Sequence, residues 1–374
     1  MPGENITLSG AVPAAGFGIS GWTGTSNDAS TAGTNSFVMP TVNHSVSVIY
    51  VDVPPTVTSI TRINANPTNR NSVVYTVTFS ESVLNVGGLD FSVTTTGSVT
   101  GASIFGVSGT GTTRNVTVLT GTGNGTIRLD VRNTATINDV VGNAFVGPYT
   151  AGPIYDVDKT VPTVTSISRV NTNPTNRNSV VYTVTFSEAV LNAGSLDFIL
   201  TTGGGVTGAS IFGVSGTGTT RSVTVLTGTG NGTIRLDVRN TATINDVAGN
   251  ALVGPYTAGQ VFDVDKTIPT VTSITRVNPG TTNLNAVVYT VTFSEAVLNA
   301  GGLDFILTTG GGVTGASIFG VSGTGTTRSV TVLTGTGSGT IRLDVRNTAT
   351  INDVAGNALV GPYTGGETYT IVKP

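Results

Sequence analysis

The sequence predicts an all-β protein that consists of three tandem two-sheet sandwiches behind a small, β-rich N-terminal module. Residues 55–374 repeat with a period of 107, and Pro55, Pro162 and Pro269 open the three copies. Each copy alternates short runs of Val, Ile and Thr with Gly- and Asn-rich turns, and helical periodicity appears nowhere. Residues 1–53 lie outside this period. We therefore expect domains at 1–53, 54–160, 161–267 and 268–374.

The copies are so similar that they indicate recent duplication. Residues 206–259 and 313–366 differ at only two of 54 positions, one of them Asn231 against Ser338. The recurrence of a residue therefore locates an element of structure, but it is no independent sign that the residue is important.

Strands follow from the alternation of apolar and polar residues in the first copy. In the sixth strand, Ile127 and Leu129 are expected to face inward and Arg128 and Asp130 outward, as in a half-buried antiparallel strand. The dipeptide Asn124-Gly125 predicts a hairpin that joins the fifth strand to the sixth. Seven short strands in roughly 100 residues favour an immunoglobulin-like sandwich. The seven strands, A to G, are predicted at residues 57–63, 73–79, 89–95, 99–107, 113–119, 126–131 and 149–157.

Composition excludes several classes of function. A net charge of -3 gives no basic surface for nucleic acid, and the absence of cysteine excludes disulfides. No apolar run reaches the length of a membrane span and no sorting signal is visible, so the first residues resemble the start of a fragment. His44 is the only histidine and lies outside the repeats, so no repeat can assemble a histidine-based catalytic or metal site. We expect no enzyme.

The N-terminal segment resembles a known family of small repeats. The steps Gly16-Phe17, Gly21-Trp22-Thr23-Gly24 and Phe37-Val38-Met39-Pro40 resemble the internalin B-repeat and related modules of bacterial surface proteins. In that family another hairpin precedes the first strand seen here, which implies a partial module. Trp22, the only tryptophan, is interpreted as a core residue of this module in preference to a sugar platform.

The three repeats also resemble a family. The segments 184–190, 232–238, 246–250 and 263–269 are similar to bacterial Ig-like domains of giant surface proteins and adhesins. The resemblance covers residues 55–374. It implies an extracellular or cell-surface location, a tandem architecture shaped as an extended rod and, in several branches, calcium at the domain junctions.

The predicted topology brings acidic side chains to one pole of each sandwich. Because successive strands reverse direction, the B–C, D–E and F–G loops return to the same pole. In the second repeat this gathers Glu188, Asp197 and Asp246, while Asp263 and Asp265 leave at the far pole toward the third repeat. Asp197 is the weakest member, and simple solvation is the favoured interpretation for it. Calcium needs six to eight oxygen ligands, which carboxylates and loop carbonyls of two domains could supply.

The sequence predicts two calcium sites at the junctions. The first junction departs from this pattern, since it offers Asp52 alone. An alternative stays open, in which the Asp-x-x-Gly-Asn segments are ordinary turns whose aspartate accepts backbone N–H groups. The ligands of the two predicted sites are Asp156, Asp158, Glu188, Asp246 and the further candidate Asn250, and Asp263, Asp265, Glu295, Asp353 and the further candidate Asn357.

Three functional hypotheses follow. The leading one is a structural stalk segment of a secreted adhesin or surface fibre, with calcium at its junctions and its receptor or glycan bound by other parts of the protein. The alternative is a subunit of an extracellular filament, in which self-association proceeds by strand addition to the partial N-terminal module. A glycan-binding accessory module is the third, but aromatics such as Tyr75 and Phe79 fall on predicted core faces.

Overall fold

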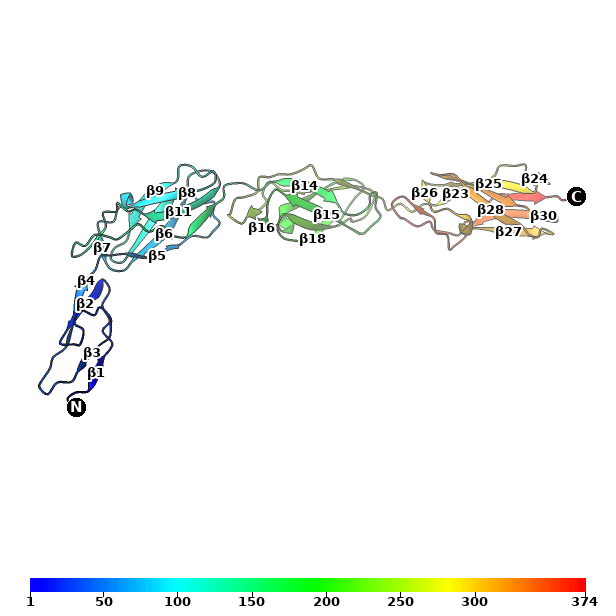
Figure 1. The fold of residues 1–374 in the computed structure, drawn as a ribbon. Coiled ribbons are helices and arrows are strands. Elements are labelled where there is room, and N and C mark those ends of the chain that lie inside the picture. Colours follow the sequence, from blue (N-terminus) through cyan, green and yellow to red (C-terminus); the bar gives the residue numbers. More distant parts are fainter. The chain divides into compact units, whose positions relative to one another are not determined.

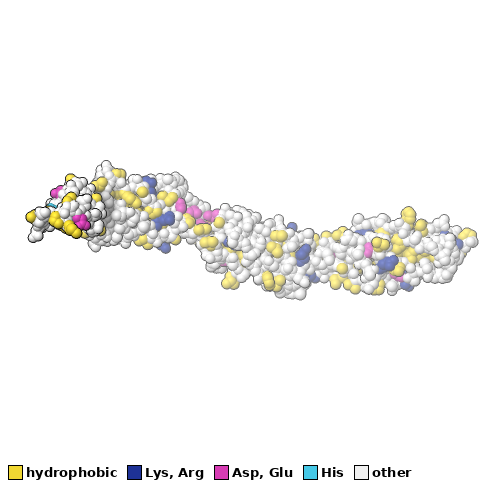
Figure 2. Space-filling model, turned by 60° about the horizontal axis from the view of Figure 1, so that its bottom comes forward, with side chains coloured by type: hydrophobic (Ala, Val, Ile, Leu, Met, Phe, Trp, Pro, Cys, Tyr) yellow, Lys and Arg dark blue, Asp and Glu magenta, His cyan; other side chains and the backbone are white.

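The computed structural model describes all 374 residues and confirms the all-β fold (Figure 1). The chain forms two compact units, residues 1–161 with 245–251 and residues 162–244 with 252–374. The helical segments are three-residue 3₁₀ turns, and none is long and apolar enough to cross a membrane. Charged side chains are sparse on the face shown in Figure 2, as the 10% charged composition leads one to expect.

The N-terminal module consists of two small antiparallel sheets. Trp22 is only 6% exposed and donates a hydrogen bond from Nε1 to the carbonyl of Ala32 at 3.1 Å, so it is a core residue, as expected. Each sheet has two strands, and every strand therefore has one edge without a ladder partner. The pairs are β1 (Asn5–Leu8) with β3 (Asn35–Val38), and β2 (Phe17–Thr23) with β4 (Ser47–Asp52).

The first repeat is a sandwich of a four-stranded and a three-stranded sheet. The strand orders A-B-E-D and G-F-C are those of the constant-type immunoglobulin fold, which confirms the predicted architecture. A short extra ladder joins β7 (Val83–Leu84) and β12 (Asn138–Asp139). The sheets are β5 (Val57–Arg62), β6 (Ser72–Phe79), β10 (Thr113–Leu119) and β9 (Ser103–Ser108), and β13 (Ile154–Val157), β11 (Gly125–Val131) and β8 (Phe91–Thr95).

A pair of tyrosines spans the core in place of a disulfide or a tryptophan. Tyr75 and Tyr155 are fully buried and meet edge to face with centroids 5.0 Å apart. The Tyr75 hydroxyl donates to the carbonyl of Ile127 at 2.8 Å, which links the two sheets, and the Tyr155 hydroxyl donates to Val74 at 3.1 Å. Each hydroxyl is thus satisfied inside the core, so the rings bury their apolar area without an unpaired polar atom.

Four expectations for this repeat are wrong in detail. Strand C begins at Phe91, because Gly88–Asp90 forms a 3₁₀ turn before it. Strands D and G begin later than predicted, at Ser103 and Ile154. The predicted E–F hairpin does not exist, because β10 and β11 belong to different sheets. The connection instead pairs with the C–D segment through mutual backbone hydrogen bonds between Thr100 and Thr122 at 3.0 and 2.9 Å.

The second and third repeats follow the same plan. In the second, the sheets are β14 (Val164–Arg169), β15 (Ser179–Phe186), β19 (Thr220–Leu226) and β18 (Ser210–Ser215), and β17 (Phe198–Gly204), β20 (Gly232–Val238) and β22 (Val261–Val264). The short strands are β16 (Val190–Leu191) and, in the first unit, β21 (Asn245–Asp246). The 3₁₀ turn is Ser195–Asp197.

The third repeat adds one short strand, β24 (Thr281–Thr282), which pairs in parallel with β32 (Thr368–Ile371). Its 3₁₀ turn is Gly302–Asp304, and its short ladder joins β26 (Val297–Leu298) and β31 (Asn352–Asp353). The remaining strands are β23 (Val271–Arg276), β25 (Ala286–Phe293), β29 (Thr327–Leu333) and β28 (Ser317–Ser322), and β30 (Gly339–Val345) and β27 (Phe305–Gly311).

Two buried acids of the second repeat serve the fold. Asp237 is 3% exposed and accepts hydrogen bonds from Arg235 Nε at 2.7 Å and from Thr201 Oγ1, on the neighbouring strand, at 2.5 Å. Asp197 is also 3% exposed, so the expectation that it is solvated is wrong. Its carboxylate accepts from the N–H groups of Gly194 and Thr243 at 2.7 and 2.6 Å. Both acids are therefore committed within their own sandwich.

Candidate metal centre

The F–G loop supplies the first carboxylate of the centre. In the first repeat, Asp139 Oδ1 accepts the N–H groups of Val141, Gly142 and Asn143 at 3.0, 2.7 and 2.8 Å, and Asn143 Nδ2 donates to Oδ2 at 2.8 Å. Gly142 has a φ of +107°, which favours glycine there. The turn chemistry that the sequence left open as an alternative is therefore present, and it also fixes the carboxylate in place.

The same loop recurs in the third repeat. Asp353 Oδ1 accepts the N–H groups of Gly356 and Asn357 at 2.7 and 2.8 Å, and Asn357 Nδ2 donates to Asp353 Oδ2 at 2.7 Å. Asn357 Nδ2 also donates to the carbonyl of Asp265 at 3.0 Å. The asparagine thus ties the incoming linker to the loop through its amide nitrogen.

The glutamate that follows strand B is the second carboxylate. Glu81 lies two residues beyond the end of β6 and is only 7% exposed. Its Oε1 is buried and has no hydrogen-bond partner, and the same holds for Oε1 of Glu295 in the third repeat. A buried, unpaired carboxylate oxygen is costly, so it calls for a ligand or a proton.

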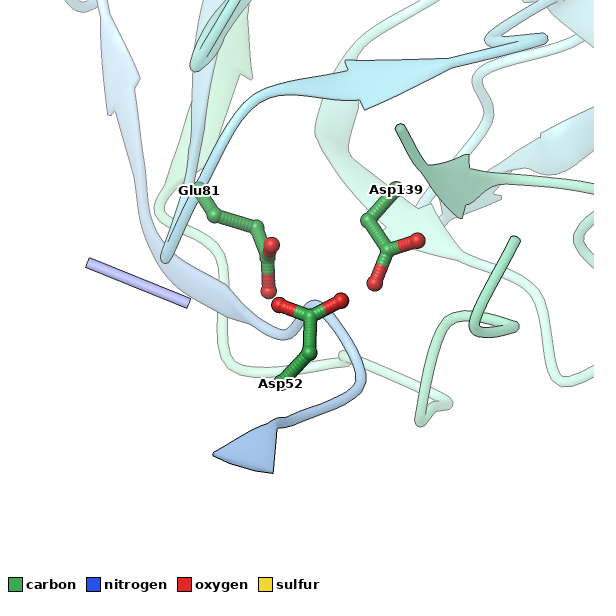
Figure 3. A group of neighbouring side chains, drawn as sticks. All are labelled: Asp52, Glu81 and Asp139. Carbon is green, nitrogen blue, oxygen red and sulfur yellow. The ribbon is translucent and has the colours of Figure 1, made fainter. Parts of the chain in front are cut away.

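Linker aspartates complete two triads. Asp52, the last residue of β4, joins Glu81 and Asp139 in the first unit (Figure 3). In the second unit, Asp265 joins Glu295 and Asp353. Each member offers one carboxylate oxygen, and within each triad these oxygens lie within 4.8 Å of one another. Such an all-oxygen donor set suits a hard divalent cation such as calcium, which binds its oxygen ligands at about 2.3 to 2.6 Å.

The electrostatics show what the triads cost without a cation. Burial raises the pKa of Glu81, and the negative charges of Asp139 and Asp52 raise it further. Burial likewise raises the pKa of Glu295, with additional contributions from Asp265 and Asp353. For Asp139, burial acts in the same direction, but the hydrogen bonds from Asn143, Gly142 and Val141 outweigh it and lower its pKa. The glutamate is thus the member that most needs compensation.

The other predicted ligands have different partners. Asp156 Oδ2 accepts from Asn66 Nδ2 at 2.7 Å, and Asp263 Oδ2 accepts from Asn173 Nδ2 at 2.7 Å. Neither acid belongs to a triad. Asp158 Oδ1 accepts the N–H of Thr160 at 2.9 Å.

The F–G loop of the second repeat repeats the turn of the others. Asp246 accepts the N–H groups of Gly249 and Asn250 at 2.7 and 2.8 Å, and Asn250 Nδ2 donates to the carbonyl of Asp158 at 2.9 Å. Asp158 and Asp246 belong to the first compact unit, whereas Glu188 belongs to the second.

The sequence did not predict the triad of the first unit. Glu81 and Asp139 stand exactly one period before Glu188 and Asp246, and that register was the available signal. Asp52 lies three residues before Pro55, whereas Asp158 lies four before Pro162. Asp52 is nevertheless the linker acid of this junction, and no site was predicted there because the other junctions carry two linker acids.

Comparison with known proteins supports the assignment of the N-terminal module. Residues 1–54 match the family model described as the divergent InlB B-repeat domain, which confirms the predicted resemblance. A search of curated proteins gave no match.

Similar solved structures include three bacterial proteins. The Escherichia coli adhesin FdeC is 14% identical, with a TM-score of 0.43 over 84% of this chain and 96% of that one. Invasin, described as a bacterial integrin-binding protein, is 10% identical, with a TM-score of 0.37 over 99% and 79%. Domains 1–6 of the surface layer protein SbsC are 16% identical, with a TM-score of 0.21 over 83% of this chain and 55% of that one. The chain therefore spans about half of that structure. These similarities are too low to bear on function. The chain thus combines an InlB B-repeat-like module with tandem immunoglobulin-like sandwiches.

Proposed function

We propose that the chain is a non-catalytic stalk segment of a secreted or surface-attached bacterial protein, in which tandem sandwiches hold another part of the protein away from the envelope. The three repeats support this proposal, because each has its own buried core and needs no partner to complete it. Near-identical sandwiches in tandem repeat the same structural unit, which suits a spacer better than a protein with a different binding pocket in each domain.

Calcium at the junctions is the finer part of the proposal. The observation that carries it is the triad Asp265, Glu295 and Asp353, where a linker acid meets two loop acids of the next sandwich around a buried, unpaired Glu295 oxygen. Three carboxylates this close repel one another, and a divalent cation turns that repulsion into attraction. Asp265, Glu295 and Asp353 would ligate the cation, and Asn357 would hold two of them in place. The repeat period assigns Asp158, Glu188 and Asp246 the same role.

Small-angle scattering of the full chain tests this function. We expect a longer maximum dimension in about 2 mM calcium, a concentration suited to extracellular calcium sites, than in chelator, because bound cations would stiffen the joints. The double variant Glu188→Gln and Glu295→Gln should lose the part of this lengthening that cations at these two junctions cause. Identical wild-type curves with and without calcium would argue against stiffening by calcium.

The same measurement addresses the filament alternative. The unpaired edges of the two-stranded sheets in the N-terminal module favour that alternative, since a strand of another chain could extend them. Forward scattering per unit protein concentration that rises with concentration would support a self-assembling subunit. A forward scattering that corresponds to one chain at every concentration would support the stalk.

A further inference from the structure

We infer that Asp52, Glu81 and Asp139 bind a divalent cation, calcium by the chemistry of their donors, and that this cation fastens the N-terminal module to the first sandwich. The inference rests on residues of the first unit alone and does not depend on the stalk function or on the later junctions. Asp52 comes from the module, whereas Glu81 and Asp139 come from the sandwich (Figure 3).

Glu81 gives the clearest sign of a missing partner. Glu81 is more than nine-tenths buried and its Oε1 accepts no hydrogen bond, although the carboxylate belongs to a cluster with two further carboxylates. Neither a lysine nor an arginine forms an ion pair with any of the three acids. A cation is the ligand that would satisfy Oε1 and neutralise its neighbours at once.

The other two acids are already positioned for a cation. Asn143 Nδ2 donates to Asp139 Oδ2 at 2.8 Å and to Asp52 Oδ2 at 3.0 Å, so one amide holds both carboxylates. In the third repeat, Asn357 Nδ2 donates to the backbone carbonyl of Asp265 and not to the Asp265 carboxylate. The first triad is therefore the more closely organised of the two.

The module also shapes the space around Glu81. A cavity of about 260 Å³ is lined by Ala15 and Phe17 of the module and by Glu81 and Thr112 of the sandwich. At Gly16, an added Cβ would lie 2.4 Å from Glu81 Oε2, so the turn packs directly on the carboxylate. The Gly16 carbonyl accepts the N–H of Val53 at 2.8 Å, which ties this turn to the residue after Asp52. The cavity leaves room for the water molecules that calcium needs to complete its ligand shell.

Trp22 provides a readout confined to the module, because the sandwiches contain no tryptophan. We expect calcium to raise the midpoint of the thermal transition that Trp22 fluorescence reports in the full chain, by about 5 °C or more over the value in chelator. The variant Glu81→Gln should abolish this shift. In chelator its midpoint should equal or exceed that of the wild type, since the amide removes a buried charge. This reversal of sign separates a lost ligand from a damaged fold.

Two further variants complete the design. Asp52→Asn should also abolish the calcium shift, and it leaves the Asp139 loop of the sandwich intact. Glu295→Gln, in the other unit, should keep the full Trp22 response even if calcium fails to stiffen the later junctions. The inference is overturned if calcium does not move the wild-type transition, or if Glu81→Gln responds to calcium as the wild type does.

Discussion

Replacement of Phe262 by alanine is expected to lower the free energy of unfolding of the second sandwich by about 3–5 kcal/mol, the usual cost of truncating a large buried aromatic side chain. Phe262 is fully buried and meets Tyr182 edge to face, with centroids 5.1 Å apart. The guanidinium of Arg169 lies over the Phe262 ring, 5.7 Å from its centroid. The variant loses all of these contacts and leaves a cavity between the two sheets.

Calorimetry of the full chain measures this effect. One transition should move down by more than about 12 °C, since 1 kcal/mol corresponds to about 4–8 °C for a domain of this size. The matched control is Phe212→Ala in the same repeat, because Phe212 is 74% exposed and its loss should change little. Equal shifts for the two variants would contradict the described core. The Trp22 transition should stay in place for both.

Gly228→Ala is expected to cost about 3 kcal/mol or more in the same sandwich. Gly228 has a φ of +69°, a left-handed conformation that costs other residues about 1–2 kcal/mol. An added Cβ would also lie 2.0 Å from the carbonyl oxygen of Thr207 and 2.7 Å from the nitrogen of Ala209. Both atoms are backbone, so the clash can be relieved only if the paired loops separate.

Gly208, in the loop that faces Gly228, provides the control. Gly208 has nearly the same φ of +70°, but an added Cβ would meet nothing within 4 Å. Gly208→Ala should therefore cost only the left-handed strain, about 1 kcal/mol. Urea unfolding of both variants separates the two contributions. If both substitutions cost the same, the close approach of the loops at Gly228 is wrong.

The strands could be predicted because their signal is local. In β11, Ile127 and Leu129 are fully buried, as alternation requires. The connection between β10 and β11 is not the predicted hairpin, although Asn124-Gly125 is a typical hairpin signal. Gly125 instead has a φ of +153°, and a Cβ there would lie 2.0 Å from the carbonyl oxygen of Thr96. That glycine serves a long-range contact, which no local pattern reveals.

The candidate site was predictable only in part. Antiparallel topology places Glu295 and Asp353 at one pole, and the structure brings them together with Asp265. Hydrogen-bond partners could not be predicted, so Asp263 stood beside Asp265 as a ligand although its carboxylate accepts from Asn173. The burial of Glu81 depends on the N-terminal module, which lies outside the repeat period, so comparison of the repeats could not reveal it.

Equilibrium dialysis of the full chain against calcium tests the central claim, that the carboxylate triads are cation sites. We predict saturable binding with dissociation constants of roughly 10⁻⁴ to 10⁻³ M, the range of extracellular modules. The stoichiometry should fall by about one equivalent in each of the single variants Glu81→Gln, Glu188→Gln and Glu295→Gln. A wild-type chain that binds no calcium saturably, or three variants that bind as much as the wild type, would contradict the claim.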